Sequence, residues 1–146
     1  ILASPHSVIA VVTRPAHAPA GRRPPPNPMR DAATAAGVPI LAPERINDPE
    51  AIAAVRALSP DLLVVCDYGQ ILSPSALAVA PYGGINLHGS LLPRHRGAAP
   101  VQWAILAGDA TTGASVTGAP SLAWRFTAPS VTVAASSSPS ELAIHR

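Results

Sequence analysis

Asn86 and His88 are the pair in this sequence whose residue types and spacing suit catalysis best. They stand two positions apart in the short apolar segment 84–88, which is typical of a β-strand running into a loop. Because side chains alternate between the faces of a strand, both would lie on one face. An Asn amide and a His ring can both donate to the oxygen of a carbonyl under attack, and His can relay a proton near neutral pH. The pair therefore suits acyl or formyl transfer.

A structural role for the same two residues remains open at this stage. Asn86 would then cap a turn, and His88 would be a polar residue at a strand end whose hydrogen bonds are satisfied. Asn-x-His is short and common, so its spacing alone favours this structural interpretation. Cys66 is expected to be a small buried hydrophobe and Trp103 a core residue. A single cysteine excludes an internal disulfide and a Cys-rich metal site, and we expect no metal centre.

The elements that must position this pair alternate regularly along the chain. Apolar runs predict strands at 8–12, 38–41, 61–66 and 84–88. Capping residues, helix-starting prolines and stopping glycines predict helices at 29–36, from 49 to about 58, from 73 onward, and at 99–107. Such alternation predicts an α/β fold with an open, mostly parallel, Rossmann-like sheet and helices on both faces. Ligands of such sheets bind at the carboxyl ends of the strands, so the loops after Val12, Cys66 and Leu87 matter most.

Composition limits the chain to one main core. The sequence has 146 residues, 48% of them hydrophobic and 12% charged, with a net charge of +2, as in soluble globular proteins. It contains no apolar run of roughly 20 residues and no visible export signal, so we expect a cytoplasmic protein without a membrane partner. From Gly118 onward Ala, Ser, Thr and Pro dominate without periodicity, which predicts an irregular tail at 118–146 beyond a domain at 1–117.

The segment 85–100 favours a catalytic role over a structural one for Asn86 and His88. It reads Ile-Asn-Leu-His-Gly-Ser-Leu-Leu-Pro-Arg-His-Arg-Gly-Ala-Ala-Pro. This resembles the signature of the folate-dependent formyltransferases, in which Asn-x-His precedes Ser-Leu-Leu-Pro and a basic, Gly-containing turn. Segments 60–65, 68–72, 104–109 and 112–113 extend the resemblance, which covers about 1–117. It implies that Asn86 and His88 are catalytic and that 10-formyltetrahydrofolate is the formyl donor. The resemblance also implies that the tetrahydrofolate site is lined by Ser90, Leu91, Leu92 and Pro93.

A second stretch, Thr13-Arg14-Pro15 followed by Pro19-Ala20-Gly21-Arg22, resembles the loop by which methionyl-tRNA formyltransferases contact the acceptor end of tRNA. It implies that Arg22 binds methionyl-tRNA, that the formyl acceptor is the initiator tRNA, and that the intact enzyme is monomeric. On charge alone Arg22 would be a solvated loop residue. A sugar nucleotide or purine precursor as acceptor, or a non-catalytic folate-binding remnant, remain the alternatives. Arg94, His95 and Arg96 are equally consistent with a solvated basic turn and with contacts to folate or tRNA phosphates.

The resemblance ends abruptly after Thr117. The family continues there with an Asp that manages the proton of the His, whereas residues 118–140 contain neither Asp nor Glu. The family's first strand has no counterpart before Ile1 either. We therefore expect a fragment of the catalytic domain that is incomplete at both ends and inactive by itself. The sharpness of the break favours a tail read in a shifted frame.

Overall fold

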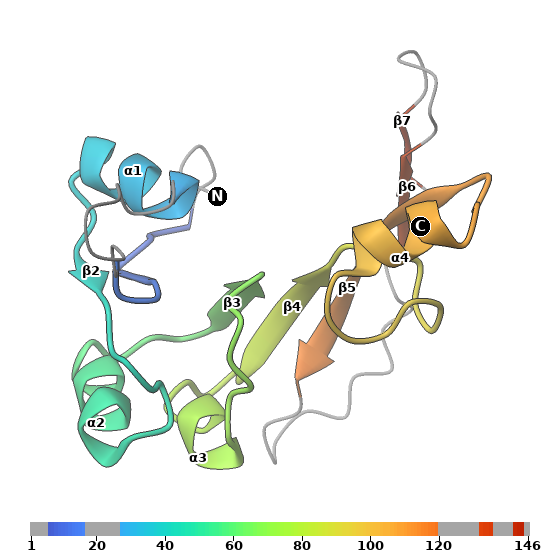
Figure 1. Cartoon of the computed structure of the whole chain (residues 1–146). Coiled ribbons are helices and arrows are strands. Elements are labelled where there is room, and N and C mark those ends of the chain that lie inside the picture. Colours follow the sequence, from blue (N-terminus) through green and yellow to red (C-terminus); the bar gives the residue numbers. More distant parts are fainter. Residues whose placement is uncertain (1–5, 17–26, 120–131, 136–141, 145–146) are drawn as a thin grey trace. The chain divides into compact units, whose positions relative to one another are not determined.

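The computed structural model describes residues 6–16, 27–119, 132–135 and 142–144 (Figure 1). The chain forms two compact units, one made of Ile1–Pro60 with Tyr68–Val79 and the other of Asp61–Asp67 with Ala80–Arg146. Among the described residues no helix has the length and apolar character that crossing a membrane requires.

In the residues that the structure describes, the first unit contains two short strands and three helices. Strands β1 (Val11–Val12) and β2 (Ile40–Leu41) pair in parallel, with Val11 opposite Ile40. The helices are α1 (Pro28–Ala35), α2 (Pro49–Ala57) and α3 (Pro74–Leu77). Its buried apolar side chains are Ala33, Ile46, Ile52, Val55 and Ala76.

All three helices of this unit begin with proline, whose fixed φ suits the first helical position and whose missing N–H has no helical partner there. The side chains of Asn27 and Ser73 accept hydrogen bonds from backbone N–H groups in the first turns of α1 and α3. Asp48 stands at the N-cap position of α2 but makes no capping hydrogen bond; its carboxylate lies 4.0 Å from Arg45 instead. The helices thus begin within one residue of the predicted positions.

The described part of the second unit is a five-stranded sheet with one helix. Its strands, in spatial order, are β3 (Leu63–Cys66), β4 (Gly84–His88), β5 (Thr112–Ala119), β6 (Thr132–Ala135) and β7 (Leu142–Ile144). Figure 1 shows β3, β4 and β5 side by side. Helix α4 (Pro100–Leu106) lies between β4 and β5 in the chain, and Ala104 is its buried residue.

The α/β class is confirmed, and so is the parallel pairing of β3 with β4. The sheet departs from the mostly parallel prediction beyond β4, because β4–β5, β5–β6 and β6–β7 are antiparallel. The chain leaves β4 at His88 and enters β5 close by, since His88 lies opposite Ser115. Residues 89–111 therefore return the chain to the carboxyl end of β4, and a strand that starts there must run backwards along its neighbour.

Within the segment 118–146, which was predicted to be an irregular tail, the structure describes the last two residues of β5 and the short strands β6 and β7. Strand β6 pairs with β5, and β7 pairs with β6. The run Thr-Val at 132–133 is rich in residues that suit strands, and the unpaired edge of β5 offers a row of hydrogen-bonding groups to a following segment. Compositional bias toward Ala, Ser and Pro concealed this pairing.

Candidate active site

Strand β4 places Asn86 and His88 as their spacing predicts. Both are half-buried, whereas Leu87 between them is exposed. Asn86 lies opposite Thr117 on β5, and His88 lies opposite Ser115. The pair therefore occupies one face at the carboxyl end of a strand that has neighbours on both sides.

Two hydrogen-bonding groups contact the His88 ring. Its Nδ1 lies 3.0 Å from the Ser90 hydroxyl, and its Nε2 lies 3.2 Å from the carbonyl oxygen of Gly97. The Ser90 hydroxyl in turn donates to the carbonyl of Arg94 at 2.8 Å. The loop after β4 therefore fixes the orientation of the ring at both nitrogens. Gly97 has a φ of +106°, a conformation that favours glycine at the position that presents this carbonyl.

The side chain of Ser115 on β5 makes two hydrogen bonds to the loop that follows β4. Its hydroxyl donates to the carbonyl of Ser90 at 2.8 Å and accepts from the N–H of Leu92 at 3.0 Å. Ser115 is 4% exposed and Ser90 is fully buried. The Ser90 N–H donates to the carbonyl of His88. The loop, the strand and the His88 ring therefore form one connected hydrogen-bond network.

This network changes the interpretation of the predicted folate segment. Every polar group of Ser90 is engaged inside the protein, so its side chain is not free to contact a ligand. The assignment of Ser90 to the lining of the folate site stays a prediction; in the structure its hydroxyl contacts His88 and the Arg94 carbonyl. Leu91 and Leu92 are half-buried and Pro93 is exposed, so these three keep accessible apolar surface. The peptide bond between Leu92 and Pro93 is cis.

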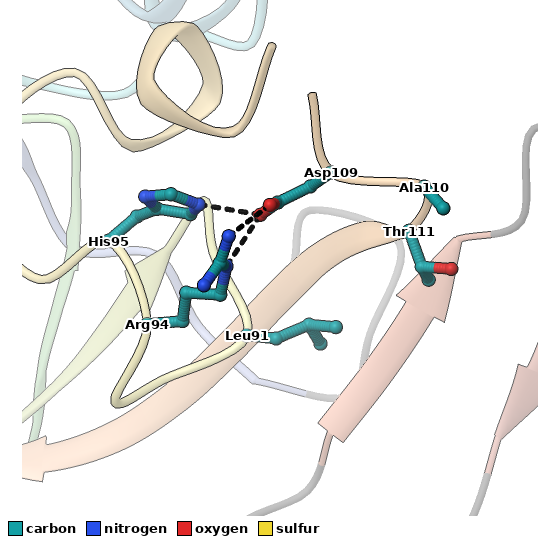
Figure 2. A pocket seen from close by; sticks show the side chains of 6 residues that line it. All are labelled: Leu91, Arg94, His95, Asp109, Ala110 and Thr111. Carbon is teal, nitrogen blue, oxygen red and sulfur yellow. Dashed lines mark hydrogen bonds and ion pairs between the residues drawn. The ribbon is translucent and has the colours of Figure 1, made fainter. Parts of the chain in front are cut away.

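A second cluster lies where the chain turns after Pro93. Arg94 donates from Nε to Asp109 at 2.7 Å and from its terminal nitrogen to the other carboxylate oxygen, and His95 Nε2 lies 2.6 Å from Asp109. Figure 2 shows both basic side chains pointing at this carboxylate. With Leu91, Ala110 and Thr111 they line a cavity of about 240 Å³. The basic turn is therefore tied to the start of β5 through Asp109.

Sequence reasoning left Arg94 and His95 unassigned and missed Asp109. A signal was present, because Asp109 is the only acidic residue between Asp67 and Glu141, and the basic turn has no other nearby partner in the chain. Hydrogen bonds from Arg94 and then from His95 hold the pKa of Asp109 well below its ordinary value. The same carboxylate raises the pKa of Arg94.

Asp109→Asn is expected to make this unit less stable at neutral pH and to remove part of its sensitivity to acid. A carboxylate with a depressed pKa in the folded state stabilises above its unfolded pKa of about 3.9, and this contribution is lost as the pH falls further. The measurement is urea unfolding between pH 7 and 3, with the exposed Asp61→Asn as the control. A variant whose stability changes with pH as the parent's does would contradict the pairing.

Arg22, predicted to bind tRNA, lies outside the residues that the structure describes.

A family model and the most similar relatives both assign this chain to the same kind of protein. A formyl transferase family model matches residues 3–119. Methionyl-tRNA formyltransferases from Rhodopirellula baltica and Acidothermus cellulolyticus are 64% identical over 93 residues and 53% identical over 116 residues, covering 64% and 79% of this chain. The chain spans only 28% and 36% of the lengths of these two relatives.

Among solved structures, phosphoribosylglycinamide formyltransferases share the fold. The protein from Bacillus halodurans gives a TM-score of 0.69 at 20% identity, covering 94% of this chain and 69% of that one. The protein from Anaplasma phagocytophilum gives 0.66 at 22% identity, covering 92% and 62%. With the family match to residues 3–119, these findings establish that the chain belongs to the formyl transferase family.

Proposed function

We propose that this chain carries the catalytic strand of an enzyme that transfers a formyl group from 10-formyltetrahydrofolate to the amino group of methionyl-tRNA. The observation that carries the proposal is the placement of Asn86 and His88 on one face of β4, at the carboxyl end of the strand. Identity of 48–64% to methionyl-tRNA formyltransferases supports the choice of acceptor.

The chemistry follows from two donors on one side of a reacting carbonyl. The amine of the methionyl group attacks the formyl carbon of the donor and forms the new C–N bond. When the tetrahedral intermediate collapses, the bond between that carbon and N10 of the folate breaks, and the proton lost by the amine passes to N10 of the departing tetrahydrofolate. The Asn86 amide and the His88 ring stabilise the negative charge that develops on the formyl oxygen. Ser90 orients the ring through Nδ1, and Nε2, whose contact with the Gly97 carbonyl is the longer one at 3.2 Å, exchanges that carbonyl for the formyl oxygen.

The folate segment in this proposal comprises Leu91, Leu92 and Pro93, with Ser90 as its buried anchor. Their accessible apolar surface suits a flat heterocycle better than a charged group. The proposal further assigns Arg22 to the tRNA, residues 1–117 to the transfer domain and 118–146 to a tail outside it. The family match to 3–119 supports that division. A cytoplasmic site of action completes the proposal, in keeping with the exposed, unpaired Cys66.

A chimera tests the function. The aligned segment of this chain replaces its counterpart in the Acidothermus cellulolyticus relative, and formylation of methionyl-tRNA is measured with 10-formyltetrahydrofolate. The chimera is expected to transfer the formyl group, and the 146-residue chain alone is not, because within its described part no carboxylate contacts the His88 ring. In the same chimera, Arg22→Ala is expected to weaken the use of methionyl-tRNA and leave folate binding unchanged. A chimera that binds folate but transfers nothing would overturn the proposal.

A further inference from the structure

The carboxylate of Asp109 stands at one end of a series of contacts that leads to the His88 ring. It accepts a hydrogen bond from Arg94 Nε at 2.7 Å and lies 2.6 Å from His95 Nε2 (Figure 2). The side chains of Asp109 and His95 are 11% and 15% exposed, so little solvent competes for this contact. The carboxylate therefore holds two consecutive residues of the turn after Pro93 by their side chains.

Asp109 is itself held by the end of helix α4. Its N–H donates to the carbonyl of Ala104 at 3.0 Å, and the N–H of Gly108 donates to the carbonyl of Ile105 at 3.0 Å. Gly108 has a φ of +68°, the left-handed conformation with which helices commonly end. Ala104 is the buried residue of this helix. The helix end thus sets the position of the carboxylate, and a fixed carboxylate can fix the turn that it binds.

The backbone of the same turn, residues 94–97, contacts the candidate site. The carbonyl of Arg94 accepts the hydrogen bond of the Ser90 hydroxyl at 2.8 Å, and this hydroxyl lies 3.0 Å from His88 Nδ1. The carbonyl of Gly97 lies 3.2 Å from His88 Nε2. The side chains of the turn therefore face Asp109, while its carbonyls face the groups around the ring. A shift of the turn would move the acceptors at both sides of the ring.

The backbone of His95 indicates that side-chain contacts hold this turn in place. Its φ is +52°, which is uncommon for a residue other than glycine. Such conformations persist where the surrounding contacts impose them. Here these contacts are the pairing of the His95 ring with Asp109 and the hydrogen bond from the Arg94 N–H to the carbonyl of Leu91. Removal of the carboxylate would therefore allow the turn to relax.

We propose that Asp109 is a positioning residue for formyl transfer, because it holds the turn that orients the His88 ring. This role rests on the proposed function, in which the ring stabilises the developing oxyanion. The contacts of Asp109 in the described structure are with the turn and the helix end, so it acts through them and not on the reacting atoms. Misplacing a catalytic group by about 1 Å can cost about 10²-fold in rate.

Kinetics of the chimera measures the consequence for the reaction. Asp109→Asn keeps the shape of the side chain and removes its charge, and kcat is expected to fall about 10-fold. The KM for the formyl donor should change by less than about 2-fold, since Ser115 holds the folate segment separately. Asp61→Asn, which removes the same charge from an exposed position in the same unit, should change neither. A kcat for Asp109→Asn equal to that of Asp61→Asn would refute the role.

A smaller folded fraction would also lower kcat, so the ring is observed directly. The ¹⁵N NMR signals of the His88 ring in the folded 146-residue chain report the hydrogen bonding of each nitrogen. Both signals are expected to shift in Asp109→Asn and to stay in place in Asp61→Asn. Unchanged signals in Asp109→Asn would show that only stability was lost, and the positioning role would fail.

A second variant separates movement of the turn from the effect of charge. Arg94→Gln breaks the same pairing from its exposed side, since the Arg94 side chain is 62% exposed, and it is expected to fold. Its kcat should fall about 3-fold. The two variants change the charge in opposite senses, so shifts of the His88 signals in one common direction would show movement of the ring. Shifts in opposite directions would show a through-space charge effect and contradict the proposal.

The NMR measurement needs no formyl donor and no transfer. If the chimera is inactive while Asp109→Asn shifts the His88 signals, the proposed function fails and the hold of Asp109 on the ring stands. If the chimera is active and Asp109→Asn alters neither kcat nor these signals, the function stands and the positioning role fails.

Discussion

Replacing His88 with Ala in the chimera is expected to lower kcat for formyl transfer by about 10²–10³-fold, because one preorganised donor to the developing oxyanion is lost. The KM for the formyl donor should change little, since the ring acts on the charge that appears during the reaction and not on ground-state binding. Steady-state kinetics with methionyl-tRNA as the varied and then as the saturating substrate separates the two parameters.

Two controls make this result specific. His6→Ala removes the same side chain from an exposed position in the other unit and should leave kcat unchanged. Asn86→Ala should reduce kcat as well, because its amide shares a strand face with His88. A His88→Ala chimera with near-normal kcat would show that the ring has only the structural role that its spacing also permits.

Ser115→Ala is expected to destabilise the protein by about 2–4 kcal/mol, the largest stability effect that we expect from removing a single atom. The Ser115 hydroxyl bonds the Leu92 N–H and the Ser90 carbonyl, and both lose this partner in a buried place. Urea unfolding of the 146-residue chain measures the change as a shift of the midpoint at constant slope.

The stability change should depend on the presence of the Ser115 hydroxyl and not on the size of the side chain at position 115. Ser115→Thr keeps the oxygen and is expected to restore most of the lost stability. Thr112→Ala removes a hydroxyl from an exposed position on the same strand and should change stability by less than about 0.5 kcal/mol. If Ser115→Ala were no more destabilising than Thr112→Ala, the loop after β4 would not depend on β5 as the hydrogen bonds indicate.

Local features of the fold could be predicted because they depend on neighbouring residues. Proline at a first helical position and a capping Asn27 or Ser73 restrict the backbone within a few residues, and the helices begin there. The common face of Asn86 and His88 follows from the two-residue period of a strand. Similarly, the apolar run that forms β3 needs no information from the rest of the chain.

The contacts that complete the site required the tertiary structure. Asp109 meets Arg94 and His95 across 15 and 14 residues, and Ser115 meets Ser90 across 25. Whether such residues meet depends on the path of 89–111, which turns the chain back and makes β5 antiparallel to β4. The sequence by itself determined which residues are chemically capable and on which strand face they lie, because propensity and period act locally. Only the tertiary structure decided that Ser90 faces His88 and that Asp109 neutralises the basic turn, because loop closure sets those distances.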